Sequence, residues 1–228
     1  MSDKVSRGRL REQVADRLEQ LQKEGVWGLS IPERELDVPA ADGSLESVEA
    51  EALACVACRL HETRTKVVFG VGSPNARLMF IGEGPGRDED LQGEPFVGRA
   101  GQLLDKIIAA MGFEREQVYI ANAVKCRPPQ NRDPQADEVS ACKSFLIRQV
   151  EIIRPEIIVL LGRSAVGAVL DLSAPLSRLR GNFRDWNGVK VMCTYHPAYL
   201  LRNPSAKAMV WEDMKRVRDT LAASGEDA

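Results

Sequence analysis

The 228-residue chain lacks any long apolar run, and no stretch approaches the roughly 20 apolar residues that a membrane-spanning helix requires. Its first residues, MSDKVSRGRL, also lack the apolar core of a secretion signal. We therefore expect a cytoplasmic protein with no membrane partner, in which the five cysteines do not form disulfide bonds. The length predicts one core of ordinary size with an appendage.

The chain also has little excess charge, with a formal net charge of −2. This value at first argues against a nucleic-acid partner. The charges are unevenly distributed, however, because residues 121–207 carry 13 Lys and Arg against 7 Asp and Glu, a net charge of +6. Binding a polyanion requires a local basic face, not a basic protein, so the net charge leaves DNA binding open.

The first 48 residues differ in pattern from the rest. An amphipathic helix is predicted over residues 2–25 and is followed by an acidic, proline-containing linker without periodicity. A second short helix is predicted to begin near Ser44 or Ser47. We predict an N-terminal extension over residues 1–48 and one domain over residues 49–224.

The remainder has no internal repeat or low-complexity tract and alternates short apolar strands with helices. Strands are predicted at about 77–82, 118–123, 157–161 and 189–195. Helices are predicted at about 100–111, 135–153, 163–170 and 205–222. This alternation is typical of an α/β fold with a parallel sheet covered by helices on both faces.

The segment between the first strand and the first helix carries the most chemical information. The apolar run at residues 78–81 ends abruptly in GEGPG, where glycines let the backbone approach a ligand. The lone Glu83 in this loop and the later Phe96 predict a ligand-binding crevice. A phosphate-binding loop is the alternative, but Pro85 and the absence of a Gly-Lys-Ser/Thr ending disfavour it.

Polar residues also follow two of the other predicted strands. Asn122 ends the second strand, and His196, one of only two histidines, follows the fourth. Ligands of parallel sheets bind beyond the carboxyl ends of the strands. Although a lone histidine is more often structural, we expect His196 to face Glu83 and Asn122 in a functional site.

Four cysteines form a candidate metal-binding set. Cys55 and Cys58 make a C-x-x-C pair, and Cys126 and Cys142 lie far along the chain. Four thiolates can hold zinc or an iron–sulfur cluster, and the absence of a second C-x-x-C favours the cluster. Cys193, within the last predicted strand, is expected to be a small buried hydrophobe. The alternative is five unrelated buried cysteines.

Three blocks of the sequence resemble the signatures of the family 4 uracil-DNA glycosylases, the iron–sulfur members of the uracil-DNA glycosylase superfamily. The blocks are GEGPGRDEDLQGEPFVGRAGQLL, VYIANAVKCRPPQNR and YHPAYLLRN. The cysteine spacing is similar too, and the resemblance covers about residues 50–222. It implies a three-layer α/β/α fold with a four-stranded parallel sheet. It also implies hydrolysis of the bond between uracil and deoxyribose in DNA, which starts base excision repair.

The resemblance implies a role for each residue of the crevice. Phe96 would stack on the flipped uracil, and Asn122 would bind uracil O4 and N3–H. Glu83 would block the methyl group of thymine, and backbone amides near Gly84 and Phe96 would contact the base. His196 would stabilise the departing uracilate anion.

The residue that activates water is less defined, because many superfamily members carry Asp or Asn at the position of Gly84. The candidates are Glu83, Glu89, Asp90 and Asn131, although Glu89 and Asp90 could equally cap a helix or bind backbone amides. The transition state resembles an oxocarbenium ion, so strong base catalysis is not a strict requirement.

The resemblance further implies a [4Fe–4S] cluster and a DNA-binding surface. The cluster ligands would be Cys55, Cys58, Cys126 and Cys142. The candidates for the wedge that fills the vacated base stack are Leu200 and Leu201, and simple helix-cap packing is the alternative for both. By their position near the crevice loops, the candidate phosphate contacts are Lys125, Arg127, Arg132, Arg178, Arg180 and Arg202, although each alone could be a solvated surface charge. We expect a monomer that binds uracil-containing DNA, single or double stranded, in a salt-sensitive manner.

Four alternatives stay open. A glycosylase with a broader preference for deaminated bases is the first. A relative that bonds covalently to DNA is the second, and it is disfavoured because NAVKCRPPQNR lacks the basic, histidine-containing insertion of that group. The others are a non-catalytic iron–sulfur DNA-binding module and a zinc-containing enzyme of the same fold.

Overall fold

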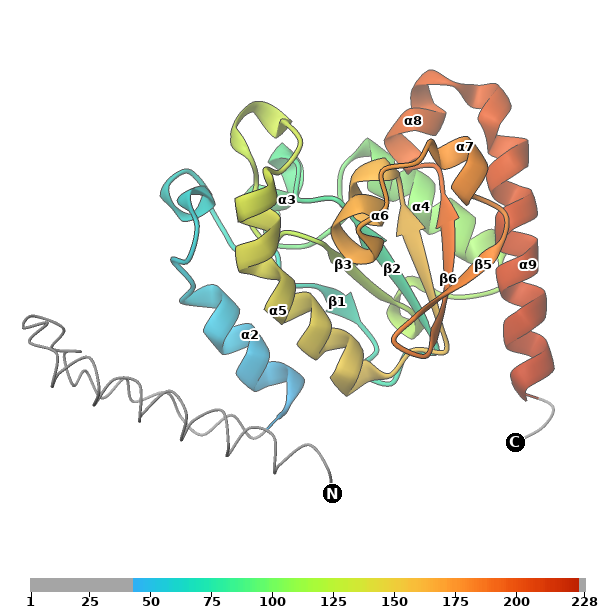
Figure 1. Ribbon diagram of the computed structural model, residues 1–228, viewed down its shortest axis with the longest axis horizontal. Coiled ribbons are helices and arrows are strands. Elements are labelled where there is room, and N and C mark those ends of the chain that lie inside the picture. Colours follow the sequence, from blue (N-terminus) through green and yellow to red (C-terminus); the bar gives the residue numbers. More distant parts are fainter. Residues whose placement is uncertain (1–42, 226–228) are drawn as a thin grey trace, which may run out of the picture. The chain divides into compact units, whose positions relative to one another are not determined.

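The computed structural model describes residues 43–225 (Figure 1). The helix predicted over residues 2–25 and the linker after it lie outside the described residues, and the domain boundary at residue 48 stays a prediction. Within residues 43–225, no helix is both long enough and apolar enough to cross a membrane.

A six-stranded sheet with the order β1-β3-β2-β4-β6-β5 forms the centre of the described part. Its strands are β1 (Val71–Gly72), β2 (Leu78–Gly82), β3 (Tyr119–Asn122), β4 (Ile157–Leu161), β5 (Phe183–Trp186) and β6 (Val189–Thr194). The four predicted strands, β3, β2, β4 and β6, pair in parallel and confirm the predicted parallel core. The sheet is larger than predicted, because β1 and β5 add antiparallel edges. Both are short and only partly buried, so neither has the apolar run that marks the core strands.

The helices are α2 (Leu45–Leu53), α3 (Arg87–Gln92), α4 (Arg99–Ala110), α5 (Ala136–Ile153), α6 (Arg163–Leu170), α7 (Leu176–Leu179), α8 (Pro197–Arg202) and α9 (Lys207–Gly225). Short 3-10 turns add η1 (Arg59–Glu62), η2 (Arg115–Gln117), η3 (Pro129–Asn131) and η4 (Pro204–Ala206). The predicted helices correspond to α4, α5, α6 and α9. The short helices α3, α7 and α8 were missed because six residues or fewer do not establish a helical period.

Two hydrophobic clusters cover the two faces of the sheet. Leu78 and Phe80 of β2 pack with residues of α4, α8 and α9. Met79 and Ile81 of the same strand point the other way and pack with residues of α5 and α6. Because successive side chains of a strand point to opposite faces, one fully apolar strand supplies both cores. The result is the predicted three-layer α/β/α arrangement, with helices on both sides of the sheet (Figure 1).

A third, smaller hydrophobic cluster joins α2 and η1 to α5. It contains Val48 and Ala52 of α2, Leu60 of η1 and Phe145 of α5. The two helices lie side by side in Figure 1, and Arg148 of α5 donates to Glu51 of α2 at 2.7 Å. The Ser44 hydroxyl accepts from the Ser47 amide at 3.1 Å and caps α2, so the predicted start of this helix is confirmed.

Candidate active site

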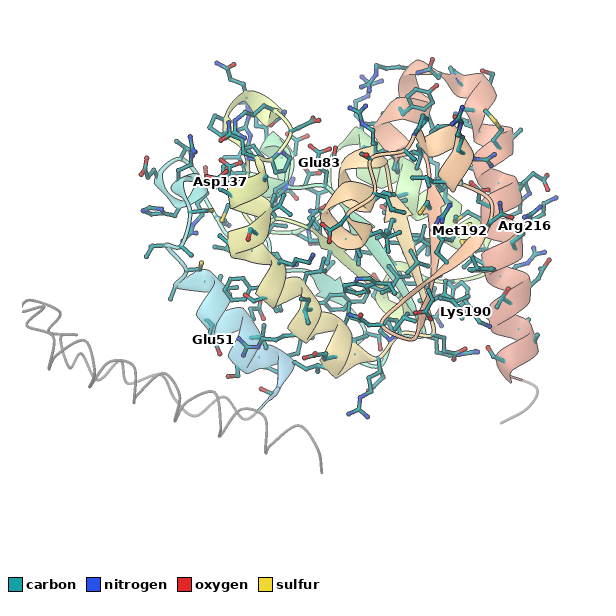
Figure 2. The ribbon with its side chains drawn as sticks, viewed as in Figure 1. Glu51, Glu83, Asp137, Lys190, Met192 and Arg216 are labelled. Atoms are coloured by element: carbon teal, nitrogen blue, oxygen red, sulfur yellow. The ribbon has the colours of Figure 1, made fainter. Side chains whose placement is uncertain are left out.

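A cavity of about 550 Å³ opens at the carboxyl ends of the parallel strands. It is lined by Glu83 and Gly84 after β2, Phe96 before α4, Asn122 at the end of β3 and His196 after β6. Figure 2 labels Glu83 at this end of the sheet. Residues singled out in three separate sequence blocks therefore line one cavity, which we call the base pocket.

Asn122 is buried, at 2% exposure, and its side-chain Oδ1 has no hydrogen-bond partner among the described residues. A buried acceptor left unpaired destabilises a protein by about 1–3 kcal/mol. The Oδ1 atom and the Phe96 ring both lie against Gly82, where any larger side chain would collide with them. An unpaired acceptor beside an aromatic ring is suited to a flat ligand that carries an N–H donor.

Phe96 is held in an unusual backbone conformation, with φ at 55°. This left-handed value is uncommon for an aromatic residue and persists only where neighbouring structure enforces it. The Phe96 carbonyl packs directly on Gly101 of α4, where a β-carbon could not fit. The Phe96 ring stacks on the His196 imidazole, with the centroids 5.5 Å apart and the planes at 29°. The loop therefore fixes the ring inside the pocket.

Glu89 holds the two ends of this loop together. Its carboxylate accepts from the amide of Gly86 at 3.0 Å, of Val97 at 3.0 Å and of Gly98 at 2.9 Å. The neighbouring Asp90, 1% exposed, accepts from the Thr65 amide at 2.8 Å. Since backbone donors occupy both carboxylates, the structure argues against Glu89 or Asp90 as the general base expected from sequence. It favours the capping alternative.

His196 is fixed in one orientation. Its Nδ1 accepts from the Ala198 amide at 3.1 Å and so caps the start of α8. Burial, and to a lesser extent the charge of nearby Arg202, lower the pKa of His196 to about 4, although Glu89 acts in the opposite direction. The imidazole is consequently neutral near pH 7, and because Nδ1 accepts, its single proton is on Nε2.

Glu83 is half-buried and differs from Glu89 in its surroundings. Burial raises the pKa of Glu83, a hydrogen bond from Ser164 lowers it, and Asp133 raises it. Glu83 lines the base pocket and also a second cavity of about 570 Å³ that α5 and α6 border. Its position between two cavities gives this carboxylate room for water.

Gly84 is closely surrounded. A β-carbon at this position would lie 2.7 Å from Val124 Cγ2, so Val124 would have to move to admit a side chain. The carboxylate or amide that many superfamily members carry here therefore does not fit without repacking.

The structure corrects two of the expected DNA contacts. Lys125 is 1% exposed, so the expectation that it contacts phosphate is wrong. Leu200 is also 1% exposed and belongs to the core, whereas Leu201 is 38% exposed. Leu201 is the one of the two predicted wedge candidates that the structure presents at the surface.

The predicted arginines differ in their partners. Arg180 binds both carboxylate oxygens of Asp213, which is 1% exposed and also accepts from Thr194. Arg132 binds both carboxylate oxygens of the fully buried Glu138. Both arginines satisfy buried carboxylates, which is a structural role.

The other three predicted arginines do not pair with buried carboxylates among the described residues. Arg178 and Arg202 are exposed, and Arg127 donates to the Asn131 side chain at 2.7 Å. Sequence reasoning also missed Tyr199, which lines the base pocket, is 38% exposed and stacks on Tyr195 with centroids 4.9 Å apart. Tyr199 lies three residues after His196 in the sequence block YHPAYLLRN, and residues three apart share one face of a helix. This spacing could have indicated that Tyr199 lies near the pocket.

The four predicted cysteine ligands line one further cavity, which we call the cysteine site. Arg64 donates to Cys126 Sγ at 3.2 Å, and the Lys125 amide donates to Cys142 Sγ at 3.3 Å. Burial raises the pKa of Cys142 to about 11 and also raises that of Cys126. Hydrogen-bond donors aimed at two sulfurs suit thiolates, so the residues fit a cofactor held by sulfur.

In residues 43–225, no three His, Cys, Asp or Glu side chains are arranged to hold one metal ion. Four thiolates can in general hold either zinc or an iron–sulfur cluster. Cys193, the fifth cysteine, is fully buried in β6, as predicted.

Comparisons with known proteins agree with this geometry. The family model described as the uracil DNA glycosylase superfamily matches residues 69–215. A type-4 uracil-DNA glycosylase of Thermotoga maritima is 46% identical over 185 residues, covering 79% of this chain and 96% of the relative. A type-4 uracil-DNA glycosylase of Archaeoglobus fulgidus is 46% identical over 182 residues, covering 76% and 92%. A type-5 uracil-DNA glycosylase of Pyrobaculum aerophilum is 36% identical over 146 residues, covering 57% and 64%.

Proposed function

The chain belongs to the uracil-DNA glycosylase superfamily, and from this premise we propose that it hydrolyses the bond between uracil and deoxyribose in DNA. The observation that carries the proposal is the buried Oδ1 of Asn122, which has no hydrogen-bond partner within residues 43–225 and lies near the Phe96 ring. The higher identity to the type-4 than to the type-5 relative favours the type-4 activity. The reaction leaves an abasic site and starts base excision repair, which we place in the cytoplasm.

Uracil recognition follows from the polarity of Asn122. Uracil is flipped out of the stack at a cost of a few kcal/mol, and stacking on Phe96 returns about 1–3 kcal/mol. The Asn122 Oδ1 accepts from uracil N3–H, and the amide NH2 donates to O4. Cytosine has neither partner in the right polarity, so it would leave buried groups unpaired, a discrimination of about 1–3 kcal/mol.

His196 provides electrostatic catalysis. As the glycosidic bond lengthens, negative charge develops on uracil N1 and O2. The Nε2–H of a neutral imidazole donates to O2 and stabilises this charge without transferring its proton. The contact with Ala198 fixes the ring beforehand, so little reorganisation accompanies the reaction.

Glu83 has two proposed tasks at the pocket edge. Its side chain excludes the C5 methyl of thymine, and its carboxylate orients the attacking water from the neighbouring cavity. Glu89 supports the loop that carries Phe96 and does not contact the reacting atoms. Backbone groups at Gly84 and Phe96 complete the contacts with the base.

The DNA-binding surface surrounds the pocket. We infer that Leu201 fills the vacated base stack and that Arg127, Arg178 and Arg202 contact phosphates in single- or double-stranded DNA. Arg132 and Arg180 contribute less, because each is committed to a buried carboxylate. We infer that the protein acts as a monomer.

We further propose that the cysteine site holds a [4Fe–4S] cluster. When bound, the cluster would cross-link the segment after α2 to the loop after β3 and to α5. The ligands would be Cys55, Cys58, Cys126 and Cys142. Arg64 and the Lys125 amide would then stabilise two of the thiolates.

Excision from defined DNA tests this function. The full chain is incubated with a labelled oligonucleotide that carries one uracil, or thymine or hypoxanthine at the same position, and abasic sites are cleaved with alkali. We expect cleavage at uracil alone, inhibited by free uracil. Binding without cleavage would favour the non-catalytic module, and cleavage at hypoxanthine would favour the broader specificity. Zinc in place of iron, without absorbance at about 400 nm, would favour the zinc enzyme.

A further inference from the structure

Lys125 is a buried cation whose partners among the described residues are all neutral. It is 1% exposed. Its Nζ donates to the backbone carbonyl of Asn122 at 3.0 Å and to Gln149 Oε1 at 2.5 Å, and it lies 5.7 Å from the centroid of the Phe69 ring. An ammonium group removed from water is strongly destabilising unless a charge of opposite sign compensates it.

The cysteine site supplies such a charge. Lys125 immediately precedes Cys126, lines the same cavity as the four cysteines, and donates its backbone amide to Cys142 Sγ at 3.3 Å. Four ligand thiolates outweigh the positive charge of an oxidised cluster, so the occupied site is net negative. With a cluster bound, the buried ammonium group would belong to a residue that lines a net negative site.

The same side chain also contacts the backbone of a residue that lines the base pocket. The Asn122 carbonyl that accepts from Nζ belongs to the residue whose side chain reads uracil. Gln149 anchors the other side of this contact, because its Nε2 donates to the Phe69 carbonyl at 3.0 Å and to Tyr119 Oη at 3.1 Å. A rigid, fully buried network therefore connects the cysteine site to the backbone of the uracil-reading residue.

We propose that Lys125 is a positioning residue with two roles: it is the counter-charge of the cluster, and it fixes Asn122 for uracil. The proposal rests on the proposed function and its cluster. It gives the cysteine site a connection to base recognition in addition to cross-linking the chain. Loss of the ammonium group favours the oxidised cluster, since one positive charge no longer stabilises the added electron.

The test compares three variants of the cluster-loaded full chain. Lys125→Met removes the charge and the donor, and Lys125→Gln removes the charge but keeps a donor. Lys143→Met is the matched control, because Lys143 follows the ligand Cys142 yet pairs with Asp171 at 3.3 Å at the surface. The readouts are the midpoint potential of the cluster, the decay of its absorbance at about 400 nm in air, and the dissociation constant of free uracil.

We expect a more negative potential and faster decay in both Lys125 variants, with the control unchanged. The dissociation constant of free uracil should rise several-fold in Lys125→Met and by a smaller factor in Lys125→Gln. Failure of both Lys125 variants to retain iron, while the control retains it, also supports the counter-charge role. Variants with iron and with unchanged potential, decay and uracil affinity overturn this inference alone. A wild-type chain that purifies without iron overturns the proposed cluster together with it.

Discussion

The base pocket and the cysteine site, which Lys125 connects by lining the second and binding Asn122 of the first, are held in place by different means. Hydrogen bonds within the chain fix the pocket. The Glu89 carboxylate accepts hydrogen bonds from three backbone amides, and His196 Nδ1 accepts one. The cysteine site brings together four thiols, two of which have hydrogen-bond donors. The pocket is thus preorganised by the protein itself, whereas the cysteine site would be held together by the proposed cluster.

The surroundings of the two regions strengthen this contrast. The pocket lies at the carboxyl ends of the parallel strands, and the side chains of the central strands β2 and β4 are buried on both faces. The cysteine site is bordered by α2, a helix of nine residues that buries Val48 and Ala52 and leaves Leu53 55% exposed. A helix this short is unstable in isolation, so its order depends on contacts that the cofactor would strengthen.

Removal of iron should have the largest effect and should separate the two regions. After chelation, we expect amides of residues 45–64 to lose protection against hydrogen exchange, while those of β2 and β4 stay protected. Mass spectrometry of exchanged peptides measures this difference. Equal loss of protection in both regions, or no loss in either, would contradict the proposal that only the cysteine site depends on the cluster for its order.

Substitution of His196 by Ala tests the pocket side. Removing one preorganised donor to a developing oxyanion lowers kcat by about 10²–10³-fold. We expect this loss in the single-turnover rate of uracil release. The matched control is His61→Ala, since the His61 Nδ1 lies 2.8 Å from the Cys58 carbonyl on the cysteine side. A similar rate loss in both iron-loaded variants would contradict the assignment.

Substitution of Arg180 by Met should destabilise the pocket scaffold. It leaves the buried Asp213 carboxylate without its cation, which costs about 3 kcal/mol. Denaturant unfolding measures the loss, with the exposed Arg178→Met as control. Unchanged stability combined with weaker, less salt-dependent DNA binding would restore Arg180 as a phosphate contact.

Substitution of Glu89 by Gln distinguishes loop support from base catalysis. The amide keeps one acceptor but loses charge-assisted bonds to the backbone, so we expect stability to fall by about 2 kcal/mol and the rate several-fold. Loss of a general base would instead lower the rate by about 10²–10⁴-fold with little change in stability. Unfolding and single-turnover rates on the same variant separate these outcomes.

The low pKa of His196 should produce the smallest effect. Between pH 6.5 and 4, the unfolded chain binds a proton on this histidine that the folded chain does not, so stability falls as pH falls. From pH 7 to pH 5.5 we expect a loss of about 1 kcal/mol that is absent in His196→Ala. Equal pH dependence of unfolding in the two proteins would disprove this contribution.

The comparison also explains which features the sequence could predict. The core strands β2 and β4 are continuous apolar runs, so their position and the convergence of Asn122 and His196 at the sheet edge followed directly. The edges β1 and β5 were missed, because Val71–Gly72 and the half-exposed Phe183–Trp186 lack such a run. The sequence therefore predicts a strand where the side chains on both faces of that strand are buried.

Charged residues were the hardest to assign from the sequence. Lys125 and Arg180 are basic residues of the kind that contact phosphates. In the structure, however, Lys125 is buried and Arg180 pairs with Asp213. Gln149 lies 24 residues from Lys125, and Asp213 lies 33 residues from Arg180, so no local sequence pattern predicts these contacts. The same holds for Glu89, whose partners on Val97 and Gly98 are backbone amides that any residue could supply.

The most direct test of the preorganised pocket is the ¹⁵N NMR titration of the imidazole of His196 in the full chain, assigned by its absence in His196→Ala. The chain has two histidines, so the spectrum is simple. We expect a neutral ring from pH 8 to pH 5, with Nδ1 unprotonated as an acceptor and the proton on Nε2. A ring that becomes protonated near the ordinary histidine pKa of about 6.5, or one protonated on Nδ1, would contradict the proposed mechanism.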